Sequence, residues 1–494
     1  MEAYRELEKR FARINKIDEA LGVLRWDYAT MMPDGGARAR GEQMSTLQVI
    51  SHEMLVDPEV GELLARVEDG ELDQWQQANV REMRREYKHA AAVPSHLVAA
   101  MSKASSGCEM VWRQARGEDD FDKFAPYLKE VVNLTRQVAQ AKGEALGCAP
   151  YDALLDNFDP GMRAATIGPI FDDLAEFLPG FIEEVLAHQA DAPAPIQPEG
   201  PFPADKQKAL SHQLMEALGF DFNHGRLDTS AHAFCGGTPD DVRLTTNYDE
   251  SDFTRSIMGT MHETGHALYS MGLPKQWRHQ PVGRARGMSI HESQSLLVEM
   301  QVCRSRDFLG FAAPMMREAF DGDGEAFSAD NLYRLSTRVE RGLIRIDADE
   351  ATYPAHVILR YRLERQMIAG TLSVEDLPEA WRAEMEELVG ITPPDDKDGC
   401  MQDIHWPSGG FGYFPTYTLG AMTAAQLFCA ARDQNPDILP SVREGDFEPL
   451  LDWLRENVHS KGSLLETDEL VAEATGESLD ADYFKAHLRE RYLA

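Results

Sequence analysis

The residues best suited to chemistry lie in one short segment, Met261-His262-Glu263-Thr264-Gly265-His266. Apolar residues around it recur at helical spacing, which predicts an amphipathic helix over about 252–271. His262 and His266, four residues apart, then project from one side of that helix, where two imidazoles can hold one metal ion. Glu263 would lie beside the ion without ligating it, and from there it can move a proton from a coordinated water to a leaving amine. The segment therefore predicts a hydrolytic metal centre with Glu263 as the general base.

A third ligand must come from elsewhere in the chain. The longer pattern that ends in a third histidine is excluded, because Tyr269 and Gly272 occupy its last two fixed positions. The first Asp or Glu after His266 is Glu292, in a segment with a helical pattern, so a second helix can carry this carboxylate to the first. We expect Glu292 to be the third ligand. Glu299, two turns later, is expected to be a hydrogen-bond partner of a metal-bound histidine or a surface residue.

Two imidazoles and one carboxylate suit Zn²⁺, with the fourth position left for water. Co²⁺ or Mn²⁺ fit the same ligands, because selectivity depends partly on which metal is available. The alternative is a helical protein that keeps a metal site without catalysis. Glu263 argues against that alternative, since a scaffold has no evident need for a carboxylate next to a metal-binding histidine.

The charge of the chain restricts its partners. The chain has 494 residues and a formal net charge of −34. Nucleic acid and anionic membranes would repel such a chain, so we expect neither as a partner. The first residues lack the apolar run of a secretion signal, and no segment reaches the roughly 18 apolar residues of a membrane span. We therefore expect a cytoplasmic protein.

The pattern along the chain is mainly helical, and a Pro-rich segment at 190–201 interrupts it. The prolines there forbid regular helix. We expect one catalytic unit over 1–494, in which this segment separates two sub-lobes, an N-terminal helical half over 1–190 and a catalytic half over 202–494.

Residues 226–248 depart from the helical pattern. Val242, Leu244, Thr246 and Tyr248 alternate with polar residues, which predicts a short strand just before the metal-binding helix. The edge of that strand could bind an extended peptide by strand addition and align it over the metal. A plain structural hairpin is an equal alternative.

Five motifs in one order extend along the chain. Besides His262-Glu263-x-x-His266 they are Asp241-Val242-Arg243-Leu244-Thr245, His291-Glu292-Ser293, Ile344-Arg345-Ile346-Asp347-Ala348-Asp349 and Gly399-Cys400-Met401-Gln402-Asp403-Ile404-His405-Trp406. Together they resemble the motifs of the carboxypeptidase Taq family of metallocarboxypeptidases. Two positions depart from the family pattern: His232-Ala233-Phe234 lacks the usual central proline, and Asn247 stands where an arginine is usual.

The expected fold is mostly α with a short β segment near 226–248. The resemblance adds a deep groove, as in neurolysin and angiotensin-converting enzymes, and commonly a homodimer. It implies peptide substrates with a free C-terminus and the removal of single C-terminal residues. An oligoendopeptidase or a dipeptidyl carboxypeptidase on the same fold is the alternative, because the zinc ligands would be identical and only the closed end of the groove would differ.

Two further groups of residues are expected around the metal. His405 with Tyr413 or Tyr417 could donate hydrogen bonds to an oxyanion, and Tyr417 is preferred because Pro415 predicts a helix start that would hold its ring. Arg345 is the first candidate for binding the terminal carboxylate, since a guanidinium fork matches that anion. The remaining substrate-binding candidates are Arg243, His232, Gln402 and Asp403. A structural ion pair is the alternative for either arginine, with Asp347 or Asp349 as the partner of Arg345.

Overall fold

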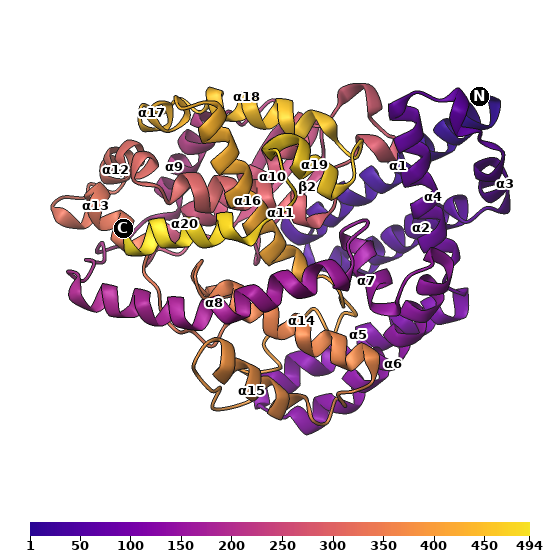
Figure 1. Ribbon diagram of the computed structural model, residues 1–494, viewed down its shortest axis with the longest axis horizontal. Coiled ribbons are helices and arrows are strands. Elements are labelled where there is room, and N and C mark those ends of the chain that lie inside the picture. Colours follow the sequence, from indigo (N-terminus) through magenta and orange to yellow (C-terminus); the bar gives the residue numbers. More distant parts are fainter.

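Three helices lie next to one another at the centre of the molecule. They are α10 (Phe253–Gly272), α11 (Met288–Leu296) and α16 (Pro415–Gln434) (Figure 1). The computed structural model describes the backbone of residues 1–494 and every side chain except that of Asp69. The chain is 69% helix and 3% strand, which confirms the mostly α fold with a small sheet. The deep groove stays a prediction.

The first part of the chain forms helices that lie on one side of this centre and beneath it in Figure 1. They are α1 (Glu2–Thr30), α2 (Ala37–Leu55), α3 (Pro58–Arg66), α4 (Gln74–Ala91), α5 (Ser95–Glu118), α6 (Phe121–Leu146), α7 (Pro150–Phe158) and α8 (Ala164–Asp191). After α8 the chain is not helical until α9 (Ala204–Ala217), as the prolines of 190–201 predict.

The remaining helices follow the segment that carries His262, His266 and Glu292. Directly after α11 comes a π-helical turn over Leu297–Cys303. The others are α12 (Arg306–Ala319), α13 (Ala329–Ser336), α14 (Tyr353–Ala369), α15 (Leu377–Leu388), α17 (Ile438–Arg443), α18 (Glu448–Asn457), α19 (Thr467–Thr475) and α20 (Ala481–Leu493). Among the described helices, none is both long and apolar enough to cross a membrane.

A small sheet precedes α10. In the described residues it has three strands, β1 (Gly225–Thr229), β2 (Cys235–Thr238) and β3 (Asp241–Thr246), in the order β1-β3-β2. β3 pairs with β1 in parallel and with β2 antiparallel. The strand predicted before the metal-binding helix is thus β3, but it lies in the middle of the sheet. Of the two equal alternatives for this strand, addition of a substrate strand to its edge is contradicted, because both of its edges are already paired.

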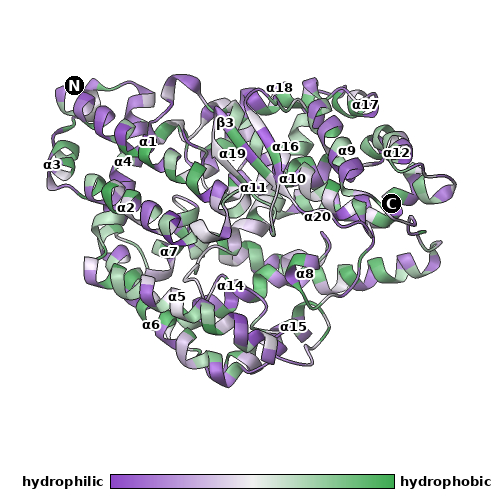
Figure 2. Ribbon diagram, turned by 180° about the vertical axis from the view of Figure 1, so that it is seen from behind, coloured by the Kyte–Doolittle hydropathy of each residue, from purple (hydrophilic) through white to green (hydrophobic). Residues whose placement is uncertain are grey.

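Two large apolar cores hold the helices together. The first combines residues of α5 to α8 with residues of α14, α15, α16 and α20. The second combines α9, the sheet, α10, α12 and the helices from α16 to α19. Outer helices such as α6 and α8 carry both hydrophobic and hydrophilic residues along their length (Figure 2), as amphipathic helices do. Each core therefore draws on segments that are far apart in the sequence.

Candidate metal centre and substrate site

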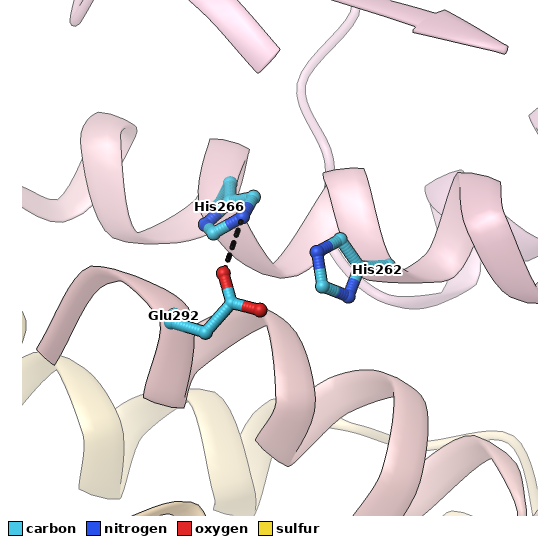
Figure 3. Close-up of side chains that lie close together, drawn as sticks. All are labelled: His262, His266 and Glu292. Carbon is cyan, nitrogen blue, oxygen red and sulfur yellow. Dashed lines mark ion pairs between the residues drawn. The ribbon is translucent and has the colours of Figure 1, made fainter. Parts of the chain in front are cut away.

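The two histidines of the helical segment meet the glutamate of the next helix. Asp252 caps α10 by accepting a hydrogen bond from the backbone N–H of Thr254, and His262 and His266 project from the same side of this helix. Glu292 extends from α11 toward both rings (Figure 3). His266 Nε2 and Glu292 Oε2 are 3.6 Å apart. The candidate ligand atoms of His262, His266 and Glu292 all lie within 4.8 Å of one another.

Two glycines let the three central helices approach closely. A Cβ on Gly265 of α10 would lie 2.5 Å from the backbone oxygen of Gln294 and 2.6 Å from Cα of Ser295, both on α11. A Cβ on Gly420 of α16 would lie 2.8 Å from Cβ of Glu292. Only glycine fits these contacts without a backbone shift. The distance between the two histidines and Glu292 thus depends on glycine at both positions, because any larger residue would push the helices apart.

The other ring nitrogen of each histidine has a hydrogen-bond partner. His262 Nδ1 donates to Glu299 Oε2 at 3.0 Å, and Glu299 Oε1 accepts from Arg304 Nη2 at 2.7 Å. His266 Nδ1 donates to the backbone oxygen of His291 at 3.0 Å. These bonds orient the rings and leave Nε2 of each imidazole for the site, an arrangement typical of metal-bound histidines. The structure thereby makes Glu299 a partner of His262, one of the two roles expected for it.

The electrostatics of this cluster favour a cation. Burial alone would lower the pKa of His262, but the hydrogen bond to Glu299 and the charges of Glu292 and Glu263 raise it to about 10. His266 shows the opposite shift, because burial and the neighbouring His291 and His262 hold its pKa well below the ordinary value. Three carboxylates, those of Glu263, Glu292 and Glu299, therefore surround the two imidazoles, and the imidazole of His266 stays neutral. Such a donor set fits a divalent metal ion.

Glu263 lies on α10 directly after His262 and is 7% exposed. Burial raises its pKa to about 7, and the charges of Glu292 and Glu299 add to the shift, although His262 opposes it. A carboxylate with a pKa near neutrality can both accept and return a proton.

A second cluster, formed by Arg345, Tyr353, Arg360 and Asp403, lies near Glu292. Burial raises the pKa of Glu292, and the nearby charge of Arg345 opposes this shift. Asp403 Oδ1 accepts from Arg345 Nη2 at 2.7 Å, and Asp403 Oδ2 accepts from Arg360 Nε at 2.7 Å. Both arginines are buried, so this group carries two positive charges and one negative charge away from water. Neither aspartate named as a possible partner pairs with Arg345. Asp347 pairs with Arg255 at 2.8 Å, and Asp349 accepts hydrogen bonds from the backbone N–H groups of Ala351 and Thr352. Arg345 donates instead to Asp403.

The predicted oxyanion donors lie beside this group. Tyr417 Oη is 3.4 Å from His405 Nε2, and the ring of Tyr413 is 5.2 Å from that of Tyr417. Burial and the charge of Glu292 raise the pKa of both tyrosines above their ordinary value, so both hydroxyls keep their protons. Burial lowers the pKa of His405 to about 4, so its ring is neutral at pH 7. As Pro415 predicts, α16 begins there and carries Tyr417 in its first turn.

The remaining substrate-binding candidates have other contacts. The side-chain oxygen of Gln402 accepts from the backbone N–H of Arg345 at 2.8 Å, and its nitrogen donates to the backbone oxygen of Asp398 at 2.9 Å. Arg243 donates to Asp241 at 2.7 Å and lies over the ring of Trp26 at 4.3 Å. His232 is exposed in the turn between β1 and β2. Their contact with substrate stays a prediction.

Two residues of the second cluster were missed from the sequence. Arg360 holds Asp403, and Tyr353 Oη lies 2.6 Å from Arg345 Nη1. Arg360 and Glu364 stand four residues apart in the stretch 355–368, but Arg362 and Arg365 are charged as well, so the sequence does not distinguish Arg360 from its neighbours. Tyr353 gives no signal either, because a tyrosine at the start of a helix is ordinary.

Comparison with known proteins shows similarity to metallocarboxypeptidases along nearly the whole chain. A family model described as carboxypeptidase Taq (M32) metallopeptidase matches residues 6–492. Thermostable carboxypeptidase 1 of Thermus thermophilus is 41% identical over 505 residues, which cover 100% of this chain and 98% of the relative. Carboxypeptidase 1 of Bacillus subtilis is 34% identical over 485 residues, which cover 97% of this chain and 96% of the relative.

Solved structures of metallocarboxypeptidases have the same fold as this chain. Metallocarboxypeptidase 1 of Trypanosoma cruzi superposes with a TM-score of 0.98 at 41% identity, with 100% of both chains covered. The M32 carboxypeptidase of Deinococcus radiodurans superposes with a TM-score of 0.93 at 33% identity, again with 100% of both chains covered. With the expected motifs in place and the match complete from end to end, this chain belongs to the carboxypeptidase Taq (M32) metallopeptidases, a family of metallocarboxypeptidases.

Proposed function

We propose that this protein is a zinc-dependent carboxypeptidase that removes single amino acids from peptide C-termini. His262, His266 and Glu292 bind the metal, and Glu263 is the general base. The observation that carries this proposal is the convergence of the three ligand groups within 4.8 Å, with Glu263 adjacent to a ligand in the chain. Zinc is the preferred metal for two imidazoles and a carboxylate, and Co²⁺ or Mn²⁺ can replace it.

The residues of the chain divide the chemistry between them. A divalent ion at these ligands would supply Lewis acidity to the scissile carbonyl and lower the pKa of a coordinated water. Glu263 takes the proton of the attacking water and then delivers it to the leaving amine. Tyr417 Oη, with His405 Nε2 beside it, donates to the oxygen that gains negative charge. Tyr413 is the second candidate for this donor.

The terminal carboxylate of the substrate is attracted by the second cluster. Arg345 alone cannot offer a free fork, because its nitrogens already donate to Asp403 and Tyr353. Arg345 and Arg360 together exceed Asp403 by one positive charge, however, and a buried excess charge favours an anion. The cluster as a whole thus takes the role first expected of Arg345.

Peptides with free and blocked ends test the activity. The metal-loaded protein is incubated with a peptide and with its C-terminally amidated twin, and the products are followed by mass spectrometry. We expect stepwise loss of single residues from the free peptide only. Glu263→Gln is the control, and it should bind the metal and leave both peptides intact.

The other outcomes identify the alternatives. Internal cuts or the release of dipeptides would favour an oligoendopeptidase or a dipeptidyl carboxypeptidase. Absence of cleavage with Zn²⁺, Co²⁺ and Mn²⁺ would favour a non-catalytic metal-binding protein. Equal cleavage of the free and the amidated peptide would contradict the proposal that the second cluster binds the terminal carboxylate.

We also propose that residues 1–494 act as one catalytic unit, because both apolar cores combine segments from distant parts of the sequence. The division into 1–190 and 202–494, the homodimer and the cytoplasmic location stay predictions.

A further inference from the structure

Most of helix α14 is buried, including three of its polar residues, which stand four positions apart. His356, Arg360 and Glu364 are each 0% exposed, and at this spacing they share one side of the helix. Arg360 holds Asp403. Glu364 has no part in the chemistry described so far, and a buried carboxylate is costly unless hydrogen bonds compensate it. Its hydrogen-bond partners indicate what this burial achieves.

The carboxylate of Glu364 accepts hydrogen bonds from three neutral groups. Trp406 Nε1 donates to Oε1 at 2.8 Å. The backbone N–H of Gly412 and the hydroxyl of Tyr151 donate to Oε2 at 3.0 Å and 2.9 Å. Burial nevertheless prevails over these donors and raises the pKa of Glu364 to about 7.

Two of these donors are the chain neighbours of proposed oxyanion donors. Trp406 follows His405, and Gly412 precedes Tyr413. The backbone N–H of Gly410 also donates to the backbone oxygen of His405 at 2.7 Å, which closes the segment between them into a turn. One carboxylate on α14 therefore holds both ends of the segment 405–413.

We propose that Glu364 is a positioning residue for hydrolysis, which holds His405 and Tyr413 next to the metal ligands through its hydrogen bonds to Trp406 and Gly412. This inference rests on the proposed function. A carboxylate that only stabilises the core would make the same contacts, so the test must separate catalysis from stability.

The first variant is Glu364→Gln. Its amide has a single acceptor oxygen, and in either orientation its NH₂ group faces a donor, Trp406 Nε1 or the backbone N–H of Gly412. We expect kcat to fall by about 10- to 100-fold, the effect of a small displacement of catalytic groups. KM should not change, because Arg345 and Arg360 hold Asp403 without Glu364. The metal content should not change either, because the proposed ligands lie on α10 and α11.

Tyr151→Phe is the matched control. It removes a hydrogen bond from the same carboxylate, but Tyr151 lies on α7 and not in the segment 405–413. We expect a lower melting temperature and an unchanged kcat.

A double-mutant cycle then tests the route through the indole. Trp406→Phe should lower kcat, and in that background Glu364→Gln should cost less, because its amide no longer opposes the indole N–H. Trp406→Phe also carries the test alone if Glu364→Gln does not fold.

Three results would overturn the proposal: wild-type kcat in Glu364→Gln, an equal loss of kcat in Tyr151→Phe, or additive effects in the cycle. Because Glu263→Gln is assayed beside these variants, an inactive Glu263→Gln with an active Glu364→Gln rejects the positioning role and leaves the proposed function intact.

Discussion

Glu299 links the candidate metal ligands to the surrounding protein. It accepts a hydrogen bond from His262 on one oxygen and one from Arg304 on the other. We expect Glu299→Ala to weaken metal affinity by about 10- to 100-fold, as the loss of a partner of a ligating histidine does. Glu292→Ala should lose the metal altogether. Competition with a chelator measures both, and Glu263→Gln is the control that retains the metal.

If Glu292→Ala keeps one equivalent of metal, the third ligand lies elsewhere. If Glu299→Ala binds as tightly as the wild type, the hydrogen bond to His262 has no influence on the ion.

The two tyrosines can be ranked by removing one hydroxyl at a time. Tyr417 Oη lies next to His405 and on the first turn of α16, so Tyr417→Phe should lower kcat by about 10²- to 10³-fold with little change in KM. Tyr413→Phe should have a smaller effect. Steady-state kinetics with one peptide decide the ranking, and a larger loss in Tyr413→Phe would reverse the assignment.

The convergence of the three candidate ligand residues could be predicted from the sequence because their geometry is local. His262 and His266 are placed by the helical repeat alone, and Glu292 was the first carboxylate to follow. Arg360 and Tyr353 could not be placed in the same way. Their contacts with Asp403 and Arg345 depend on how α14 packs against two other segments, the 399–414 loop and the turn at 345–347, which no periodicity encodes.

At the level of elements, the close approach of α10 and α11 depends on Gly265. A Cβ there would lie 2.5 Å from a backbone oxygen of α11, so Gly265→Ala must push the two helices apart. We expect it to lower the melting temperature and to weaken metal binding, because Glu292 moves away from the histidines.

Gly259→Ala is the matched control on the same helix, since no atom outside the adjacent backbone of α10 lies within 4 Å of its added Cβ. Without a clash, alanine should raise stability by up to about 1 kcal/mol through its higher helix propensity. Thermal unfolding and a zinc titration compare the two. Equal effects of the two substitutions would mean that the contact at Gly265 is unimportant.

The helix that carries His262 and His266 was predicted well, and the sheet was predicted poorly. This helix was expected over about 252–271 and spans Phe253–Gly272. Alternation identified β3, but β1 and β2 are only 5 and 4 residues long, too short for a clear pattern. Alternation of apolar and polar residues also does not show which strands pair, so only the structure reveals that β3 is the central strand. The π-helical turn that carries Glu299 gave no signal either.

For the whole molecule, buried ion pairs determine the response to acid. Arg491 and His487 hold the pKa of Glu350 well below its usual range despite burial, and arginines do the same for Asp403. A carboxyl group whose pKa is lower in the folded state stabilises the protein above its unfolded pKa of about 4, and this stabilisation is lost as the pH falls further.

We therefore expect the urea midpoint to drop steeply between about pH 4 and pH 2. Glu350→Gln should have a lower midpoint at pH 7 and a shallower drop, because it lacks one of these titrating groups. Unfolding curves at several pH values measure this. A midpoint that stays constant down to pH 2 would contradict the contribution of the buried pairs.

The candidate metal ligands and the proposed oxyanion donors lie far apart in the sequence, and this has a consequence for protein synthesis. His262, His266 and Glu292 leave the ribosome together, whereas His405, Tyr413 and Tyr417 are translated much later. A growing chain thus contains its metal ligands before it contains the groups proposed to stabilise the oxyanion. Hydrolysis by this mechanism has to wait until α16 has been made and has packed against α11, so the nascent protein lacks a complete active site beside its own unfolded segments.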